Sequence, residues 1–149
     1  MKIAINTVLI MSLSFLYYTK CSAQNNKLDS VKIEFAGFNI ETVFDVSCEA
    51  FDGTFKGTKT KRSFNNSRDL LKFQSLTKEF KRLTKKQSFD VRGAIVYSYG
   101  KTNEKYCFDT FGCFYKDGKL YYNKGLLIYL TDKLFTNHPE YLDTLQHHE

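Results

Sequence analysis

The chain has 149 residues, a formal net charge of +6 and a single proline, a length that fits one domain able to bury a core without obligatory disulfides. The scarcity of proline argues against long disordered linkers, and the 14 Phe and 10 Tyr residues favour a sheet with large side chains packed under helices. No phosphate-binding glycine motif and no EF-hand spacing occurs, so the sequence excludes these two classes of site.

The first predicted element is an export signal over residues 1–23. Lys2 supplies a positive start, and residues 3–18 are mostly apolar and carry no charge. Cys21-Ser22-Ala23 then places small residues where a signal peptidase reads them. We therefore expect cleavage after Ala23 and an exported mature protein.

Two alternatives remain open for this segment. An uncleaved anchor would need about twenty predominantly apolar residues, and the apolar run is shorter and contains Asn6 and Thr7. A lipoprotein would keep and acylate Cys21. Lys20 argues against acylation, because the residue before such a cysteine is normally small.

After a flexible leader over residues 24–30, we expect one domain over 31–149 that begins with three strands. Apolar residues alternate with polar ones over 31–35 and again over 44–48, which is the period of half-buried strands. Weaker alternation over 54–64 predicts a third strand at a sheet edge, where lysines discourage pairing with another chain.

Residues 68–84 form the most regular predicted helix. Asn65-Asn66-Ser67 is a start signal, and Asp69 suits the first turn. One apolar stripe at helical spacing follows, made of Leu70, Phe73, Leu76, Phe80 and Leu83.

The second half of the chain predicts further strands and a second helix. A strand over 89–99 would place Phe89, Val91 and Ile95 on one face, and a hairpin loop over 100–103 would lead to a return strand over 104–110. Asp117-Gly118 is a strong signal for another hairpin. The second helix would be capped by Asn123 and buried through Leu127, Leu130 and Leu134, and Pro139 would begin a short last helix.

The predicted order is therefore β-β-β-α-β-β-β-α plus a short C-terminal helix. Tight turns join most of the strands, which implies antiparallel pairing. We expect an α+β, two-layer sandwich with a mainly antiparallel sheet of five to six strands and two helices on one face.

Signal cleavage would leave an odd number of cysteines, namely Cys48, Cys107 and Cys113. They are either small buried hydrophobes on strands, or two of the three form one disulfide with any of three pairings. A metal or catalytic role lacks support, because no CxxC or Cys/His spacing occurs.

The histidines give no sign of a catalytic base. His138, His147 and His148 all lie in the C-terminal segment, so a Ser-His-Asp or Cys-His mechanism would need its base from the tail. We predict no catalytic residue, no metal site and no cofactor.

Charged side chains on the predicted strands offer the best candidate site. Asp45, Glu49, Asp90 and Asp109 lie on these strands, and Arg92 lies among them. They form either cross-strand ion pairs on a solvated sheet face or a polar binding patch. We take Asp45, Glu49, Arg92 and Asp109 as the candidate binding patch, and paired carboxylates keep a small hydrolase open as an alternative.

Basic residues cluster over 56–62 and 78–86. Such a stripe can attract an anionic surface, although an amphipathic helix must also present a solvated polar face. Export argues against a nucleic-acid partner.

The Ser22-Ala23-Gln24 processing site, the size and the Lys-, Asn-, Phe- and Tyr-rich body resemble short exported bacterial proteins of unknown function. This resemblance transfers no active site. We predict a periplasmic or secreted, non-enzymatic binding or interaction protein without a transmembrane helix in its mature part. Its partner would be an envelope protein or an anionic surface. The alternatives are a carboxylate-dependent hydrolase and an envelope protein lipid-anchored through Cys21.

Overall fold

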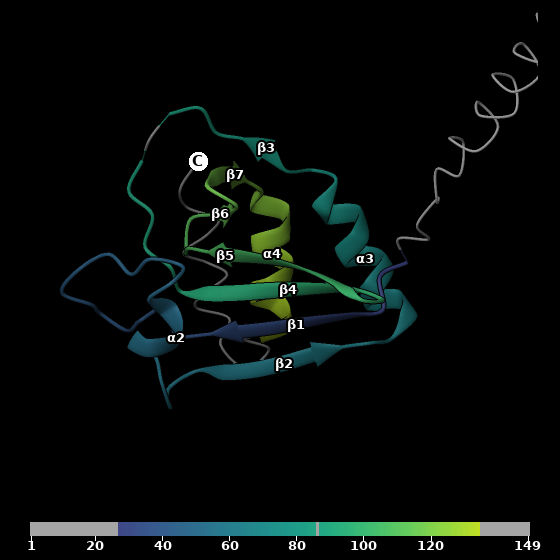
Figure 1. Cartoon of the computed structure of the whole chain (residues 1–149), viewed down its shortest axis with the longest axis horizontal. Coiled ribbons are helices and arrows are strands. Elements are labelled where there is room, and N and C mark those ends of the chain that lie inside the picture. Colours follow the sequence, from purple (N-terminus) through teal and green to yellow (C-terminus); the bar gives the residue numbers. More distant parts are fainter. Residues whose placement is uncertain (1–26, 86, 135–149) are drawn as a thin grey trace, which may run out of the picture.

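A computed structural model describes residues 27–134 with the exception of residue 86 (Figure 1). The predicted signal segment, Cys21, the three histidines and the helix expected after Pro139 lie outside the described residues. Leu28 falls in the predicted flexible leader, yet it is buried in the core, and the Asp29 amide donates to the Ser98 carbonyl over 2.8 Å. The packed domain therefore includes residues before position 31.

Within the described residues, seven strands form one antiparallel sheet, which confirms the α+β class and the mainly antiparallel pairing. The expected number of five to six strands is wrong. The strand order is β2-β1-β4-β5-β6-β7-β3. The strands are β1 (Ser30–Phe35), β2 (Thr60–Phe64), β3 (Lys81–Arg82), β4 (Gly93–Tyr99), β5 (Thr102–Phe108), β6 (Cys113–Lys116) and β7 (Lys119–Tyr122).

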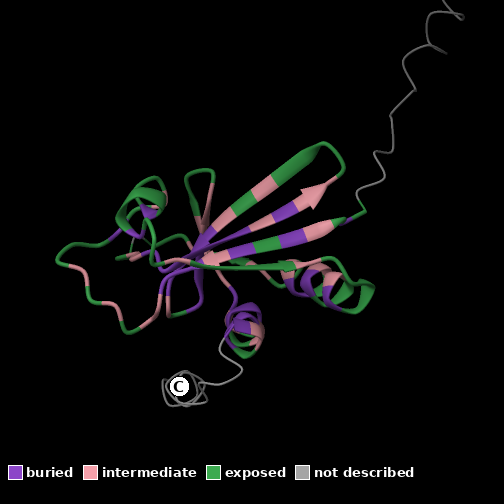
Figure 2. Ribbon diagram, turned by 90° about the horizontal axis from the view of Figure 1, so that it is seen from below, coloured by how far each residue is buried: buried purple, intermediate pink, exposed green. Residues whose placement is uncertain are grey.

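Two long helices, α3 (Ser67–Thr77) and α4 (Lys124–Leu134), pack on the same face of this sheet (Figure 2). Their buried residues join the apolar side chains of β1, β4, β5 and β6 in one cluster. Phe73 of α3 meets Tyr97 of β4 edge to face, with ring centroids 6.3 Å apart. This cluster is the main hydrophobic core of the domain.

Both predicted helix starts are confirmed by side-chain caps. Asn66 Oδ1 accepts from the Asp69 amide over 2.9 Å, and Asn123 Oδ1 accepts from the Leu126 amide over 2.8 Å. The predicted end of the first helix is wrong, because α3 stops at Thr77 rather than at residue 84. Lys81 and Arg82 instead form strand β3.

The strand expected over 44–48 is absent. These residues belong to a long loop that ends in the short helix α2 (Phe51–Thr54). The predicted third strand is correct only over β2, which lies at the sheet edge as expected.

Helix α2 and the loop before it cover one end of the other sheet face (Figure 2). Their apolar side chains form a second, smaller cluster with Val91, Ala94 and Cys107. Val91 therefore packs on the side opposite Ile95, against the prediction that the two share a face. The alternation breaks because the Arg92 amide bonds to the Phe108 carbonyl, while Phe108 is also the register partner of Gly93.

Candidate functional site at one end of the sheet

Three segments far apart in the sequence meet at one end of the sheet (Figure 1). Phe35 at the end of β1 pairs with Gly93 at the start of β4, and Gly93 pairs with Phe108 at the end of β5. Residues 36–50 follow Phe35, residues 88–92 precede Gly93, and residues 109–112 follow Phe108. We call them together the loop end of the sheet.

Arg92 is the buried polar centre of the loop end. Its Nη2 lies 2.5 Å from Asp90 Oδ2, and its Nη1 donates to Asp90 Oδ1 over 2.8 Å. The guanidinium also lies over the Phe55 ring, 5.6 Å from the ring centroid. A buried cation requires such partners, because an unpaired charge removed from water is costly.

Both residues of this ion pair also form hydrogen bonds with the 36–50 loop. Asp90 Oδ1 accepts from the Val46 amide over 2.8 Å, and Arg92 Nη2 donates to Thr42 Oγ1 over 3.0 Å. The Val91 amide donates to the Val46 carbonyl over 2.9 Å. The loop therefore has a defined path although it contains no strand.

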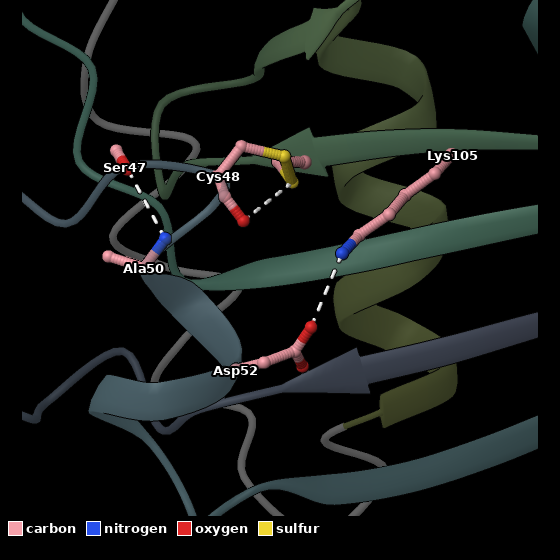
Figure 3. The surroundings of a disulfide bond; sticks show 6 residues. Ser47, Cys48, Ala50, Asp52 and Lys105 are labelled. Atoms are coloured by element: carbon pink, nitrogen blue, oxygen red, sulfur yellow. Dashed lines mark hydrogen bonds and ion pairs between the residues drawn. A yellow bond between two sulfur atoms is a disulfide. The ribbon is translucent and has the colours of Figure 1, made fainter.

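A disulfide between Cys48 and Cys107 gives the loop a covalent attachment to β5 (Figure 3). The two Cα atoms are 5.7 Å apart, a normal separation for this bond. The structure thus selects one of the three pairings left open by the sequence and leaves Cys113 as a buried free thiol. Figure 3 also shows Asp52 at the start of α2 facing Lys105, 3.5 Å away.

Asp109 shapes the turn after β5 and does not face solvent. Its Oδ1 accepts from the Phe111 and Cys113 amides, each over 2.8 Å. Burial raises the pKa of the Asp109 carboxyl, although these two amide donors oppose the rise. Such local bonding is a common role for aspartate in a turn.

Asp45 and Glu49 are the exposed members of the candidate patch. Ser88 donates to Asp45 Oδ2 over 2.5 Å, which joins two segments of the loop end. Hydrogen bonds from its own backbone amide and from the Ser47 hydroxyl lower the pKa of Glu49.

The structure therefore corrects the proposed arrangement of the four patch residues. All four lie at or beside the loop end, but Arg92 and Asp109 are buried and serve its internal bonding. The cross-strand ion pairs expected among them are replaced by the local pair of Arg92 with Asp90. Only Asp45 and Glu49 remain as surface groups that a partner can contact.

Sequence reasoning missed the most exposed apolar residues of the loop end. Val43 and Phe44 are 89% and 81% exposed, and Phe111 is 69% exposed. The alternation over 44–48 predicts a half-buried strand in which Phe44 faces inward, because it alternates with polar neighbours. The available signal was Val43 itself, since two adjacent apolar residues cannot both face inward on one strand.

For the hydrolase alternative the relevant geometry is the placement of the carboxylates, of which Glu34 and Asp52 both bind Lys59. Glycosidase-type chemistry needs two carboxyl groups about 5–9.5 Å apart across the substrate. Separate pockets are lined by Asp29, by Asp45 and by Glu104, each without a second carboxylate. Within the described residues, no three His, Cys, Asp or Glu side chains gather as metal ligands.

Comparisons with protein families, with curated proteins and with solved structures found no match. Across residues 27–134, none of the helices is both long enough and apolar enough to span a bilayer.

Proposed function

We propose that this protein is an exported, non-enzymatic binding protein that contacts a protein partner through the loop end of the sheet. The observation that carries the proposal is the exposure of Val43 and Phe44 on a loop held by a disulfide, a buried ion pair and backbone hydrogen bonds. Large apolar side chains grouped on a surface mark interaction sites.

The bracing of the loop matters for affinity. Binding through a free loop costs about 0.5–1.5 kcal/mol for each side chain that becomes ordered, and a fixed loop avoids part of that cost. The attachments through Asp90, Thr42 and Cys48 hold both sides of the Val43–Phe44 pair.

The charges of the loop indicate what the partner carries. Glu41, Asp45 and Glu49 are exposed around the apolar pair. An anionic lipid surface would be repelled by these carboxylates, so we favour a protein with an apolar pocket and cationic groups at its rim.

The disulfide also supports export. Disulfides form and persist in oxidising compartments and are rare where glutathione keeps thiols reduced. Together with the signal pattern of residues 1–23, Cys48–Cys107 favours a periplasmic or secreted location. Mass analysis of the mature protein tests this, with Gln24 expected as its first residue. An acylated Cys21 would instead establish the lipid-anchored alternative.

Site-specific photo-crosslinking tests the binding surface. A photoreactive phenylalanine analogue at position 44 should give one discrete adduct in cells that export the protein. The matched control is position 71, because Leu71 is apolar and 67% exposed but lies on α3, away from the loop end. The absence of adducts from positions 43, 44 and 111, or equal adducts from position 71, would contradict the proposal.

A further inference from the structure

A second feature of the surface lies beside the β6–β7 hairpin, near the edge of the sheet that β3 forms. A pocket of about 580 Å³ opens between this hairpin and residues 82–85, 87 and 89. It is lined by Arg82, Leu83, Thr84, Lys85, Gln87, Phe89, Tyr115, Gly118, Lys119 and Leu120. Of these residues, Phe89 belongs to the loop end, where it packs against the smaller cluster, and the others lie outside the loop end.

The floor of the pocket is apolar and firmly held. Tyr115 pairs with Leu120 in the β6–β7 register, and the Leu83 amide donates to the Leu120 carbonyl over 2.9 Å. The Phe89 ring approaches the Tyr115 ring with centroids 6.0 Å apart and planes inclined by 34°. Two aromatic rings therefore offer faces or edges against which another ring can stack.

The rim of the pocket is cationic. Arg82, Lys85 and Lys119 line it, and no aspartate or glutamate does. In the part of the chain that the structure describes, none of the carboxylate ion pairs involves these three side chains. Cations gathered around an apolar surface raise the local concentration of anions.

One wall also carries a neutral polar group. Gln87 Nε2 donates to the buried Cys113 sulfur over 2.7 Å, which fixes the position of its side chain. The amide oxygen and the Thr84 hydroxyl add polar groups to a pocket that is otherwise aromatic and cationic.

We propose that this pocket binds a small organic anion in which a carboxylate, sulfate or phosphate is carried on a ring. The ring would lie against Phe89 and Tyr115, and the anionic group would bind Arg82, Lys85 and Lys119. The volume is within the range of about 300–1,000 Å³ typical of small-molecule sites. This proposal does not rest on the proposed protein contact, because the anion-binding groups Arg82, Lys85 and Lys119 lie outside the loop end.

Two pairs of probes distinguish the two chemical classes from which such an anion can come. Digalacturonate with its neutral analogue digalactose represents acidic sugars, and 2-naphthyl phosphate with 2-naphthol represents aromatic anions. Isothermal titration with the folded protein at low salt should show at least one anionic probe binding tenfold or more tighter than its neutral analogue. The binding should weaken as salt is added, since exposed charges are screened.

Charge reversal then locates the site. Lys119→Glu should weaken the binding of the anionic probe at least tenfold, and so should Lys85→Glu at the opposite side of the rim. Both residues are exposed, so the variants should retain the circular dichroism and melting temperature of the wild type. Lys101→Glu is the matched control, because Lys101 is an exposed lysine in the β4–β5 turn outside the pocket.

Three outcomes would overturn the proposal. They are the absence of binding by both anionic probes at millimolar concentration, equal binding of anionic and neutral probes, and equal losses in the Lys101→Glu control and the two pocket variants. Because Lys85 and Lys119 lie on different segments, a folding defect in one variant leaves the other to decide.

Discussion

Arg92 and Asp90 are two residues apart in the sequence, and their ion pair is also the point where the 36–50 loop joins the sheet. Asp90 Oδ1 accepts hydrogen bonds from Arg92 Nη1 and from the Val46 amide, each over 2.8 Å. The Arg92 side chain is 8% exposed, and the Asp90 side chain is 30% exposed. The stability of the domain and the shape of the proposed contact surface therefore depend on one carboxylate.

Removal of Asp90 should consequently destabilise the domain strongly. In Asp90→Ala the buried Arg92 loses its counter-ion, a change that typically costs about 3–5 kcal/mol. Since Asp90 itself is partly exposed, we expect a loss of about 2–4 kcal/mol in the free energy of unfolding, measured by urea denaturation. Asp52→Ala is the control, because the Asp52 side chain is 59% exposed and its partner Lys59 keeps Glu34 as a second counter-ion, so the loss should stay below about 1 kcal/mol. Equal losses in the two variants would contradict a special role for Asp90.

The disulfide should provide a comparable stabilisation by a different route. Cys48 and Cys107 are 59 residues apart, and closing a loop of this length in the unfolded chain is worth about 4 kcal/mol in the chain-entropy model. The Cys48→Ala, Cys107→Ala double variant should lose about 2–4 kcal/mol in urea unfolding. Dithiothreitol should destabilise the wild type and leave this variant unchanged. If the reductant has no effect on the wild type, the bond is not formed in the mature protein.

Local signals were sufficient for several elements of the fold. Asn66 and Asn123 cap helices because their side chains bond to amides three residues ahead. The Asp117-Gly118 hairpin is also predictable from local residues. Both residues adopt the positive φ angles, 49° and 75°, that this turn requires. In each case the partner atoms lie within a few residues, so the sequence alone contains the relevant information.

Other elements depend on partners that are distant in the sequence. Phe80 continued the helical stripe, but it stacks on Tyr106 with centroids 5.0 Å apart, from a segment that has left α3. Val46 alternates like a strand residue, yet its backbone bonds to Asp90 and Val91, about 45 residues away. Periodicity therefore does not identify the backbone conformation of a segment when its partners are distant in the sequence.

The candidate site was predicted in the same partial way. Asp45 and Glu49 do lie on the surface, whereas Arg92 and Asp109 are buried. The charges in the sequence suggested a functional patch, but a buried charge with local partners has the same sequence signature. Burial distinguishes the two, and it is set by packing against distant segments, such as the 36–50 loop that bonds to Asp90.

The free thiol of Cys113 should be unreactive in the folded protein. Burial raises its pKa to about 12, and the charge of Asp109 adds to this effect. Since the thiolate is the reactive form, less than about one thiol in a thousand is ionised at pH 8. Iodoacetamide at pH 8 should leave Cys113 unmodified in native protein and alkylate it in 6 M guanidinium, as read by peptide mass spectrometry. Rapid alkylation of the native protein would contradict the buried position.

A side chain at position 93 should lower the free energy of unfolding. A Cβ atom at this position would lie 2.1 Å from Cζ of the buried Phe108 ring, its register partner across the β4–β5 pair. We expect Gly93→Ala to cost about 1–3 kcal/mol in urea unfolding through overpacking. Phe108→Leu should cost less in the Gly93→Ala background than in the wild type, because the smaller side chain relieves the clash. Additive losses would show that the ring and the glycine are not coupled.

The pH dependence of stability should report the link between the two long helices. Asp69 at the start of α3 accepts from Asn66 Nδ2 over 2.6 Å and from the Tyr129 hydroxyl of α4 over 2.7 Å, and Lys133 lies 3.1 Å away. These hydrogen bonds, that of Asn66 first, lower the pKa of Asp69 from 3.8 to about 2. A carboxyl with a depressed folded-state pKa stabilises the native state above its unfolded pKa, and that contribution is lost as the pH falls through the folded pKa.

Asp69→Asn should therefore be less stable than the wild type by about 1–2 kcal/mol near pH 5. The difference should shrink as the pH falls from 4 to 2, because Asp69 takes up a proton in the unfolded chain at a higher pH than in the folded protein. Urea unfolding at pH 5, 4, 3 and 2 measures this, with Asp132→Asn as the control, since Asp132 is exposed on the same helix as Tyr129. A stability difference that stays constant over this range would mean that the cost of Asp69→Asn comes from lost packing or capping and not from the charge that joins α3 to α4.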